Sequence, residues 1–199
     1  MSHNSKAISK SVAICVAGIP GAGKTTLLRT HVELESRDMQ VTGSSIVKTI
    51  IAPASVHELD GWPPELRQTV REQSIFKLRQ LQQQCSGRML VDGHFTLRNR
   101  VTGVLEPIFT PEDKTFFQAL VLIHPRAESV LAQRKSDGRA RSVESVGDVA
   151  AHIEFELQEG RQLARDMKVP LLELVECELP QRLQALAEFL DRIAPLETL

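Results

Sequence analysis

Short apolar runs alternate along the chain with longer segments in which apolar and polar positions are mixed. Apolar runs of four to eight residues are typical of strands that are buried on both faces of a parallel sheet. The pattern predicts strands at 12–17, 39–42, 88–91, 119–124 and 171–175. The mixed segments between them predict helices at about 24–35, 44–51, 64–85, 127–134, 143–167 and 180–193.

Two segments lack a clear pattern. Residues 52–64 hold three prolines and a glycine, which predicts a loop. Residues 95–118 are expected to be irregular, with a short helix after Pro111. The alternation of strands and helices predicts a single α/β domain, residues 1–199, in which a parallel sheet of about five strands has helices on both faces. In such a sheet the ligand site lies beyond the carboxyl ends of the strands.

A glycine-rich stretch follows the first predicted strand. Residues 18–25, GIPGAGKT, fit the pattern G-x-x-x-x-G-K-[ST] of a phosphate-binding loop (P-loop). Its backbone N–H groups and the start of the next helix form an anion site, and Lys24 reaches the β- and γ-phosphates of ATP. The alternative is a glycine turn that only packs a helix on a strand. The predicted ATP-binding residues are Gly18, Gly21, Ala22, Gly23, Lys24, Thr25 and Thr26.

A carboxylate and an imidazole follow the strand 88–91. Asp92 lies where a second-strand acid faces the P-loop, so we expect it to hold Mg²⁺, directly or through water, together with the Thr25 hydroxyl. The alternative is a turn aspartate, since Asp-Gly is a common turn dipeptide. His94 shares the face of Asp92 if the chain stays extended, and it is either a substrate contact or a structural hydrogen-bonding group.

Two further sets of basic residues come from other parts of the chain. Arg134, Arg139 and Arg141 lie in a polar segment between two predicted helices, which predicts a short lid at about 134–145 that offsets charge on the phosphoryl group. Arg67 and Arg71 are four residues apart and share one helix face, so they are candidates for binding a second substrate. The alternative for each set is that its residues form an ordinary solvent-exposed face with no role in binding.

Three segments together resemble the archaeal-type adenylate kinases and the related eukaryotic nuclear adenylate kinase-like proteins. They are GIPGAGKTT at 18–26, VDGH at 91–94 and HPRAESVLAQRKSDGRAR at 124–141, and His152 also falls where that family often has a histidine. The resemblance implies a three-layer P-loop fold of the nucleoside monophosphate kinase type. It also implies an acceptor-binding insert at about 42–85, in which Ser44 and Ser45 stand where another polar pattern is expected.

The residues and the resemblance together predict an ATP- and Mg²⁺-dependent kinase. Lys24, Asp92, Arg134, Arg139 and Arg141 are the predicted catalytic residues. The acceptor-binding candidates are Ser44, Ser45, Arg67, Arg71 and His94. The acceptor is a nucleotide or, alternatively, a hydroxyl of a metabolite or a polynucleotide 5′ end, for which Asp92 is the candidate base. An ATP-hydrolysing protein that regulates a partner stays open as well.

Composition and charge narrow the classes of partner and compartment. The formal net charge of −1 does not favour nucleic acid, although a local basic patch stays open. The N-terminus has no secretory apolar segment and no run is long enough to cross a membrane, so we expect no membrane association. The three cysteines are widely spaced, which predicts free thiols in the reducing cytoplasm.

Overall fold

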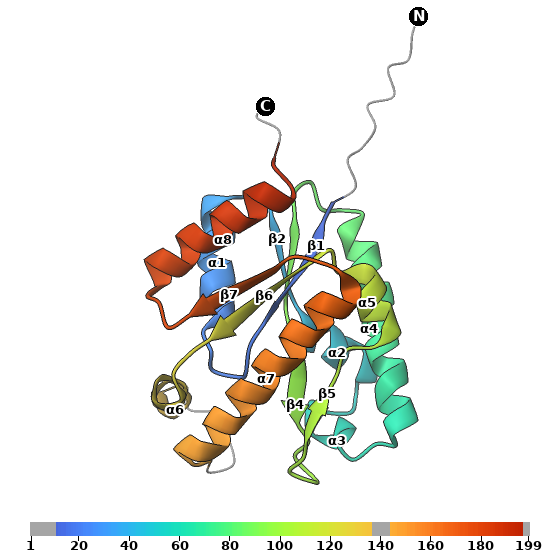
Figure 1. The fold of residues 1–199 in the computed structure, drawn as a ribbon. Coiled ribbons are helices and arrows are strands. Elements are labelled where there is room, and N and C mark those ends of the chain that lie inside the picture. Colours follow the sequence, from blue (N-terminus) through green and yellow to red (C-terminus); the bar gives the residue numbers. More distant parts are fainter. Residues whose placement is uncertain (1–10, 137–143, 197–199) are drawn as a thin grey trace, which may run out of the picture.

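The computed structural model describes residues 11–136 and 144–196. Five parallel strands form the central sheet in the order β2-β3-β1-β6-β7 (Figure 1). These are the five predicted strands, with ends that differ by at most one residue. The strands are β1 (Ala13–Ala17), β2 (Met39–Thr42), β3 (Met89–Asp92), β6 (Ala119–His124) and β7 (Leu171–Val175).

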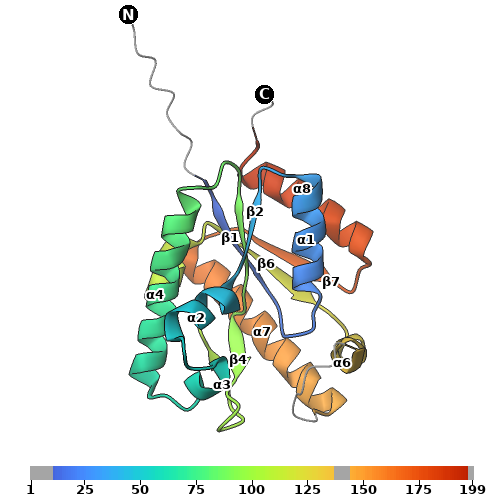
Figure 2. The same ribbon diagram turned by 180° about the vertical axis from the view of Figure 1, so that it is seen from behind.

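Helices cover both faces of this sheet, as Figures 1 and 2 show from opposite sides. The helices are α1 (Lys24–Leu34), α2 (Gly43–Ile51), α3 (Val56–Leu59), α4 (Pro64–Gln82), α5 (Pro111–Phe116), α6 (Ala127–Ser136), α7 (Val146–Met167) and α8 (Leu179–Ile193). The predicted three-layer α/β fold is therefore confirmed. No helix in the described ranges combines the length and the apolar composition needed to cross a membrane.

Successive side chains of each strand point to opposite faces of the sheet and so divide the core into two layers. On β1, Ile14 and Val16 pack with apolar side chains of α1 and α8, whereas Ala13, Cys15 and Ala17 pack with those of α4, α5 and α7. Successive side chains of a strand point to opposite faces, so a continuous apolar run supplies both layers. All five residues of β1 are buried, which fixes the strand that leads into the P-loop.

The expectation that residues 95–118 are irregular before the short helix was wrong in part. A two-stranded antiparallel hairpin, β4 (Thr96–Arg98) with β5 (Leu105–Pro107), lies there. Strands of three residues are too short to show a period of two. Between them the Asn99 side chain accepts hydrogen bonds from the N–H groups of Val101 and Thr102 and so closes the turn. The short helix after Pro111 is present as α5.

The predicted loop 52–64 contains one turn of helix, α3. The Ser55 side chain accepts from the Glu58 N–H, and the Glu58 side chain accepts from the Ser55 N–H, which is a capping box. The pattern Ser-x-x-Glu is visible in the sequence and is the signal that the prediction missed. Together α2, α3, the start of α4 and the hairpin lie near the carboxyl ends of β3 and β1, opposite α6 (Figure 1).

Candidate active site

The P-loop curls between β1 and α1 with three glycines at positive φ. Gly18 has φ 146°, Gly21 has φ 92° and Gly23 has φ 88°, a region that side-chain-bearing residues rarely adopt. At Gly18 a Cβ atom would also lie 2.9 Å from the Ile123 carbonyl oxygen of β6. The Ala22 N–H closes the turn by donating to the Ile19 carbonyl at 3.1 Å. The glycines are therefore required by the loop's shape.

Helix α1 begins inside the predicted motif, at Lys24, with Gly23 as its N-cap and no side-chain cap. In the described part of the chain, the first-turn N–H groups of Lys24, Thr25 and Thr26 donate to no hydrogen-bond acceptor. These orphan donors and the positive end of the helix dipole face the same way. The arrangement is suited to an anion such as a phosphate group.

The Lys24 side chain is folded into the loop and is 6% exposed. Its Nζ donates to the Gly18 carbonyl at 2.7 Å and to the Ile19 carbonyl at 3.3 Å, and lies 3.9 Å from Asp92 Oδ1. Burial lowers the pKa of Lys24, while the charges of Asp92 and Glu156 act to raise it. The ammonium is thus held by weak neutral acceptors that an anionic ligand can replace.

Thr25 and Asp92 meet where α1 begins and β3 ends. Thr25 Oγ1 donates to Asp92 Oδ2 at 2.5 Å, although the two residues are 67 positions apart. Hydroxyl and carboxylate oxygens are ligands that Mg²⁺ prefers, completed by waters and phosphates. Outside the undescribed segments no cluster of three His, Cys, Asp or Glu side chains could hold a metal. Thr25 and Asp92 supply two oxygen ligands for a hard cation, and the remaining ligands would come from substrate and water.

Arg134 extends from α6 over the P-loop. Its Nε donates to the Pro20 carbonyl at 2.8 Å, and its Nη1 pairs with Glu144 just before α7. Arg134 is thus near the phosphate site, as predicted, but a carboxylate already engages it. Arg139 and Arg141 lie outside the described residues, so their lid role stays a prediction.

His94 is half-buried beside the P-loop. Burial lowers its pKa well below the usual range, and the positive charge of Lys24 adds to this effect, while a hydrogen bond to the Gly18 backbone opposes it. The imidazole is therefore neutral at pH 7. Lys24 and Arg134 are among the charges that act on His94, in keeping with its place beside the P-loop.

The other acceptor-binding candidates lie on the insert. Arg67 on α4 is paired with Glu106 of β5, with 2.5 Å between Nη1 and Oε2. Arg71, one turn on, is half-buried and makes no hydrogen bond or ion pair within the described ranges. Burial lowers the pKa of Arg71 and so does the charge of Arg67. A guanidinium without a partner is ready to receive an anion.

Ser44 and Ser45 are exposed in the first turn of α2. This helix begins against β3, because a Cβ atom on Gly43 would lie 3.2 Å from the Asp92 carbonyl oxygen. Both serines are therefore near the strand end that carries Asp92. Their role in acceptor binding, like those of Arg67, Arg71 and His94, stays a prediction.

Two acidic residues at this site were missed by sequence reasoning. Glu144 pairs with Arg134 and lies 3.4 Å from Arg98 Nε of the hairpin. Glu156 is 1% exposed on α7 and accepts from the Gly18 N–H at 3.1 Å. The signal for Glu156 was available, since it falls on the apolar face of α7 between Ile153 and Gly160.

Comparisons with known proteins agree with this geometry. A family described as an AAA domain matches residues 17–150, which hold the P-loop, Asp92 and the start of α7. The adenylate kinase of Methanothermobacter thermautotrophicus is 28% identical over 146 residues, covering 70% of this chain and 76% of that protein. The resemblance to adenylate kinases is thus confirmed.

Solved structures share the fold at low identity. Shikimate kinase from Acinetobacter baumannii, in complex with shikimate, superposes with a TM-score of 0.58 at 17% identity, covering 93% of this chain and 96% of that one. Deoxyadenosine kinase from M. mycoides with bound dATP superposes with a TM-score of 0.56 at 12% identity, covering 90% of this chain and 100% of that one. The chain belongs to the AAA-domain family of P-loop proteins and is an enzyme of the kinase or ATPase type.

Proposed function

We propose that the protein is a phosphotransferase that moves the γ-phosphoryl group of ATP to a nucleoside monophosphate or a similar small acceptor. The observation that carries this proposal is the contact of Thr25, at the end of the glycine loop, with Asp92 at 2.5 Å. Lys24 Nζ lies 3.9 Å from the same carboxylate. A phosphate cradle, a cation and a metal-binding pair in one place are the parts that phosphoryl transfer needs.

Each residue has one task in this account. The N–H groups at the start of α1 bind the phosphate oxygens, and Lys24 leaves the carbonyls of Gly18 and Ile19 to contact the β- and γ-phosphates. Thr25 and Asp92 would hold Mg²⁺, which would neutralise charge on the phosphates. Arg134 lies above the loop, and we assign Arg139 and Arg141 to the same charge-offsetting role.

The engagement of Asp92 favours an acceptor that is already ionised. If Asp92 serves Mg²⁺ together with Thr25, whose hydroxyl lies 2.5 Å from it here, it is not available as the base that a hydroxyl acceptor would need. A nucleoside monophosphate attacks with an anionic oxygen and needs no base. The similarity to an adenylate kinase supports the same class of acceptor.

Arg71 is the proposed anchor for the acceptor phosphate. Replacing it with alanine is expected to raise the KM of the acceptor about tenfold to a hundredfold, with a much smaller change in the KM of ATP, because the guanidinium contacts only the acceptor. Arg79→Ala, two turns along the same helix and exposed, is the matched control. Steady-state kinetics with each substrate varied in turn makes the measurement. Equal KM values in both variants would contradict the assignment.

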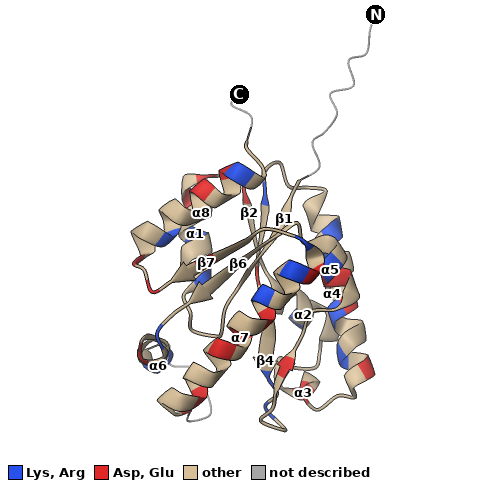
Figure 3. Ribbon diagram, in the orientation of Figure 1, with Lys and Arg blue, Asp and Glu red and all other residues tan. Residues whose placement is uncertain are grey.

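The identity of the acceptor is tested with a panel of candidate substrates. ADP formation from Mg²⁺-ATP is measured with nucleoside mono- and diphosphates, small hydroxyl metabolites and 5′-OH oligonucleotides. We expect a nucleoside monophosphate to give the largest stimulation. If only a hydroxyl acceptor stimulated ADP formation, the protein would instead be a kinase of hydroxyl acceptors. The same panel addresses nucleic acid, for which Figure 3 gives no support: acidic and basic residues are interspersed along α4 and α7 in that view.

We place the reaction in the cytoplasm. Cys15, Cys85 and Cys177 are all free thiols. Free thiols persist in a reducing compartment.

A further inference from the structure

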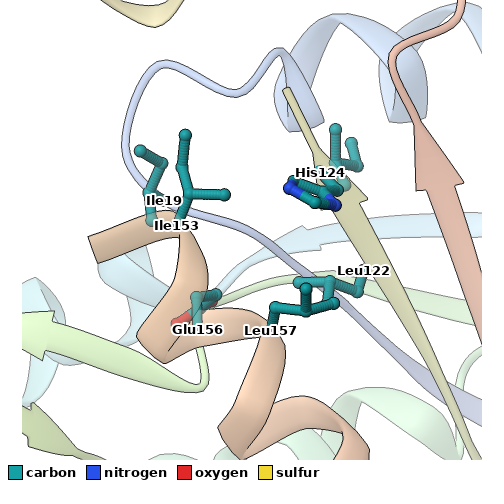
Figure 4. Close-up of a pocket in the computed structure, with 7 residues that line it drawn as sticks. Ile19, Leu122, His124, Ile153, Glu156 and Leu157 are labelled. Atoms are coloured by element: carbon teal, nitrogen blue, oxygen red, sulfur yellow. The ribbon is translucent and has the colours of Figure 1, made fainter. Parts of the chain in front are cut away.

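Glu156 is the most deeply buried carboxylate of the site, and the proposed phosphoryl transfer gives it no task. It lies on α7, one turn from Ile153, which lines the same pocket as Ile19 of the P-loop (Figure 4). Glu156 is 1% exposed. A carboxylate in such a place is costly unless hydrogen bonds replace its water shell.

Four donors from two other segments supply those hydrogen bonds. Oε1 accepts from the N–H of Gly18 at 3.1 Å and from that of Phe95 at 2.9 Å. Oε2 accepts from the N–H of Thr96 at 2.6 Å and from the Thr96 hydroxyl. One side chain therefore joins the first residue of the P-loop, the turn that follows Asp92, and helix α7.

Gly18 is held on its other sides as well. Its carbonyl accepts from Lys24, and its Cα lies against β6 so closely that no side chain fits. Phe95 and Thr96 follow Asp92 within four residues. The β1–β3 ladder already pairs Val16 with Asp92. Glu156 adds a second link, beyond the ends of these strands, between the first residue of the P-loop and the turn after Asp92.

We infer that Glu156 is a positioning residue that sets the Thr25–Asp92 pair for Mg²⁺-ATP, an inference that rests on the proposed function. A metal ligand on each of two separate segments binds well only when the segments are held at the right spacing. Without the Glu156 bridge, the P-loop can still bind phosphate through its N–H groups. The contribution of the metal to that binding depends on the bridge.

The carboxylate form is required for this role. Burial raises the pKa of Glu156, while hydrogen bonds from Thr96 and Phe95 and the charge of Lys24 oppose the rise. A carboxylate accepts well at both oxygens, and two donors face each of them here. In Glu156→Gln the amide NH₂ must face one pair of donors, so at least one backbone N–H loses its acceptor. The substitution keeps the shape of the side chain and breaks the bridge.

The test measures how much Mg²⁺ strengthens nucleotide binding. The dissociation constant of a non-hydrolysable ATP analogue is determined by calorimetry with Mg²⁺ and with EDTA. The value in EDTA divided by the value in Mg²⁺ is the factor by which the metal strengthens binding, and this ratio is compared among variants. We expect Glu156→Gln to lower this ratio about tenfold, with a smaller change in the EDTA value. Glu154→Gln is the matched control, since Glu154 is exposed on the same helix and, among the residues described, accepts from Gln158 alone.

A second variant keeps the test decisive if Glu156→Gln folds poorly. Thr96→Val removes one donor of the four and keeps the shape, and we expect the ratio to fall in the same direction by a smaller factor. Melting temperatures are recorded for all variants. A lower melting temperature with an unchanged ratio in both variants would make Glu156 a purely structural residue and overturn the inference. A wild-type protein whose binding is indifferent to Mg²⁺ would instead count against the proposed function.

Discussion

Replacing Lys24 with alanine is expected to reduce kcat/KM by about a thousandfold or more, on the order of 4 kcal/mol of transition-state stabilisation. The ammonium is the only part of the P-loop that brings a full positive charge to the phosphates. That charge is worth more as negative charge shifts during transfer than it is in the ground state. The measurement is steady-state ADP formation with the best acceptor.

Folding must be checked in the same experiment, because Lys24 is buried and donates to Gly18 and Ile19. Circular dichroism should give the same spectrum as the parent, since the core clusters of the sheet do not include this side chain. Lys77→Ala, on the exposed face of α4, is the matched control and should retain activity. Full activity of Lys24→Ala would remove the basis of the phosphate-binding assignment.

Asp92→Asn is expected to lower kcat/KM by about a hundredfold to a thousandfold, on the order of 2.7–4 kcal/mol, and to raise the Mg²⁺ concentration needed for half-maximal rate. Asparagine keeps the shape and can still accept from Thr25, but it lacks the charge that attracts the metal. The substitution also removes the negative charge that raises the pKa of Lys24. We therefore expect burial to lower this pKa further.

Binding in EDTA separates these effects from a loss of the site. The affinity of the ATP analogue without Mg²⁺ should change less than about threefold, since the N–H cradle is intact. Asp166→Asn, an exposed aspartate on α7, should behave as the parent. If Asp92→Asn turned over normally at limiting Mg²⁺, Asp92 would be a turn residue, which is the alternative weighed from the sequence.

The parts of the site that could be predicted are those whose chemistry is encoded locally. Gly18 to Thr25 are consecutive, and the motif fixes both the loop's shape and its ligand class. Asp92 could be placed because the ends of parallel strands meet at one edge of the sheet, and its contact with Thr25 agrees with that expectation. The five strands were found for a similar reason, since each is a short apolar run buried on both faces.

The rest depends on contacts between distant segments. Arg67 looked free on a helix face, but Glu106 from an unforeseen hairpin pairs with it. The hairpin strands have three residues each and carry no periodicity. The Gly18–Glu156 bond spans 138 positions, and only an acid on an apolar helix face hinted at it. Arg134 lies beside the P-loop, where its Nε donates to the Pro20 carbonyl, but its pairing with Glu144 follows from how α6 and α7 pack. Its catalytic role stays a prediction.

The fate of the γ-phosphoryl group tests the central claim most directly. ATP labelled at the γ-position is incubated with the protein, Mg²⁺ and a nucleoside monophosphate, and the products are separated. The account predicts that the label appears in the nucleoside diphosphate in step with ADP formation and that Lys24→Ala abolishes both. Label found only as inorganic phosphate, at a rate that no acceptor changes, would contradict it and identify the protein as an ATPase.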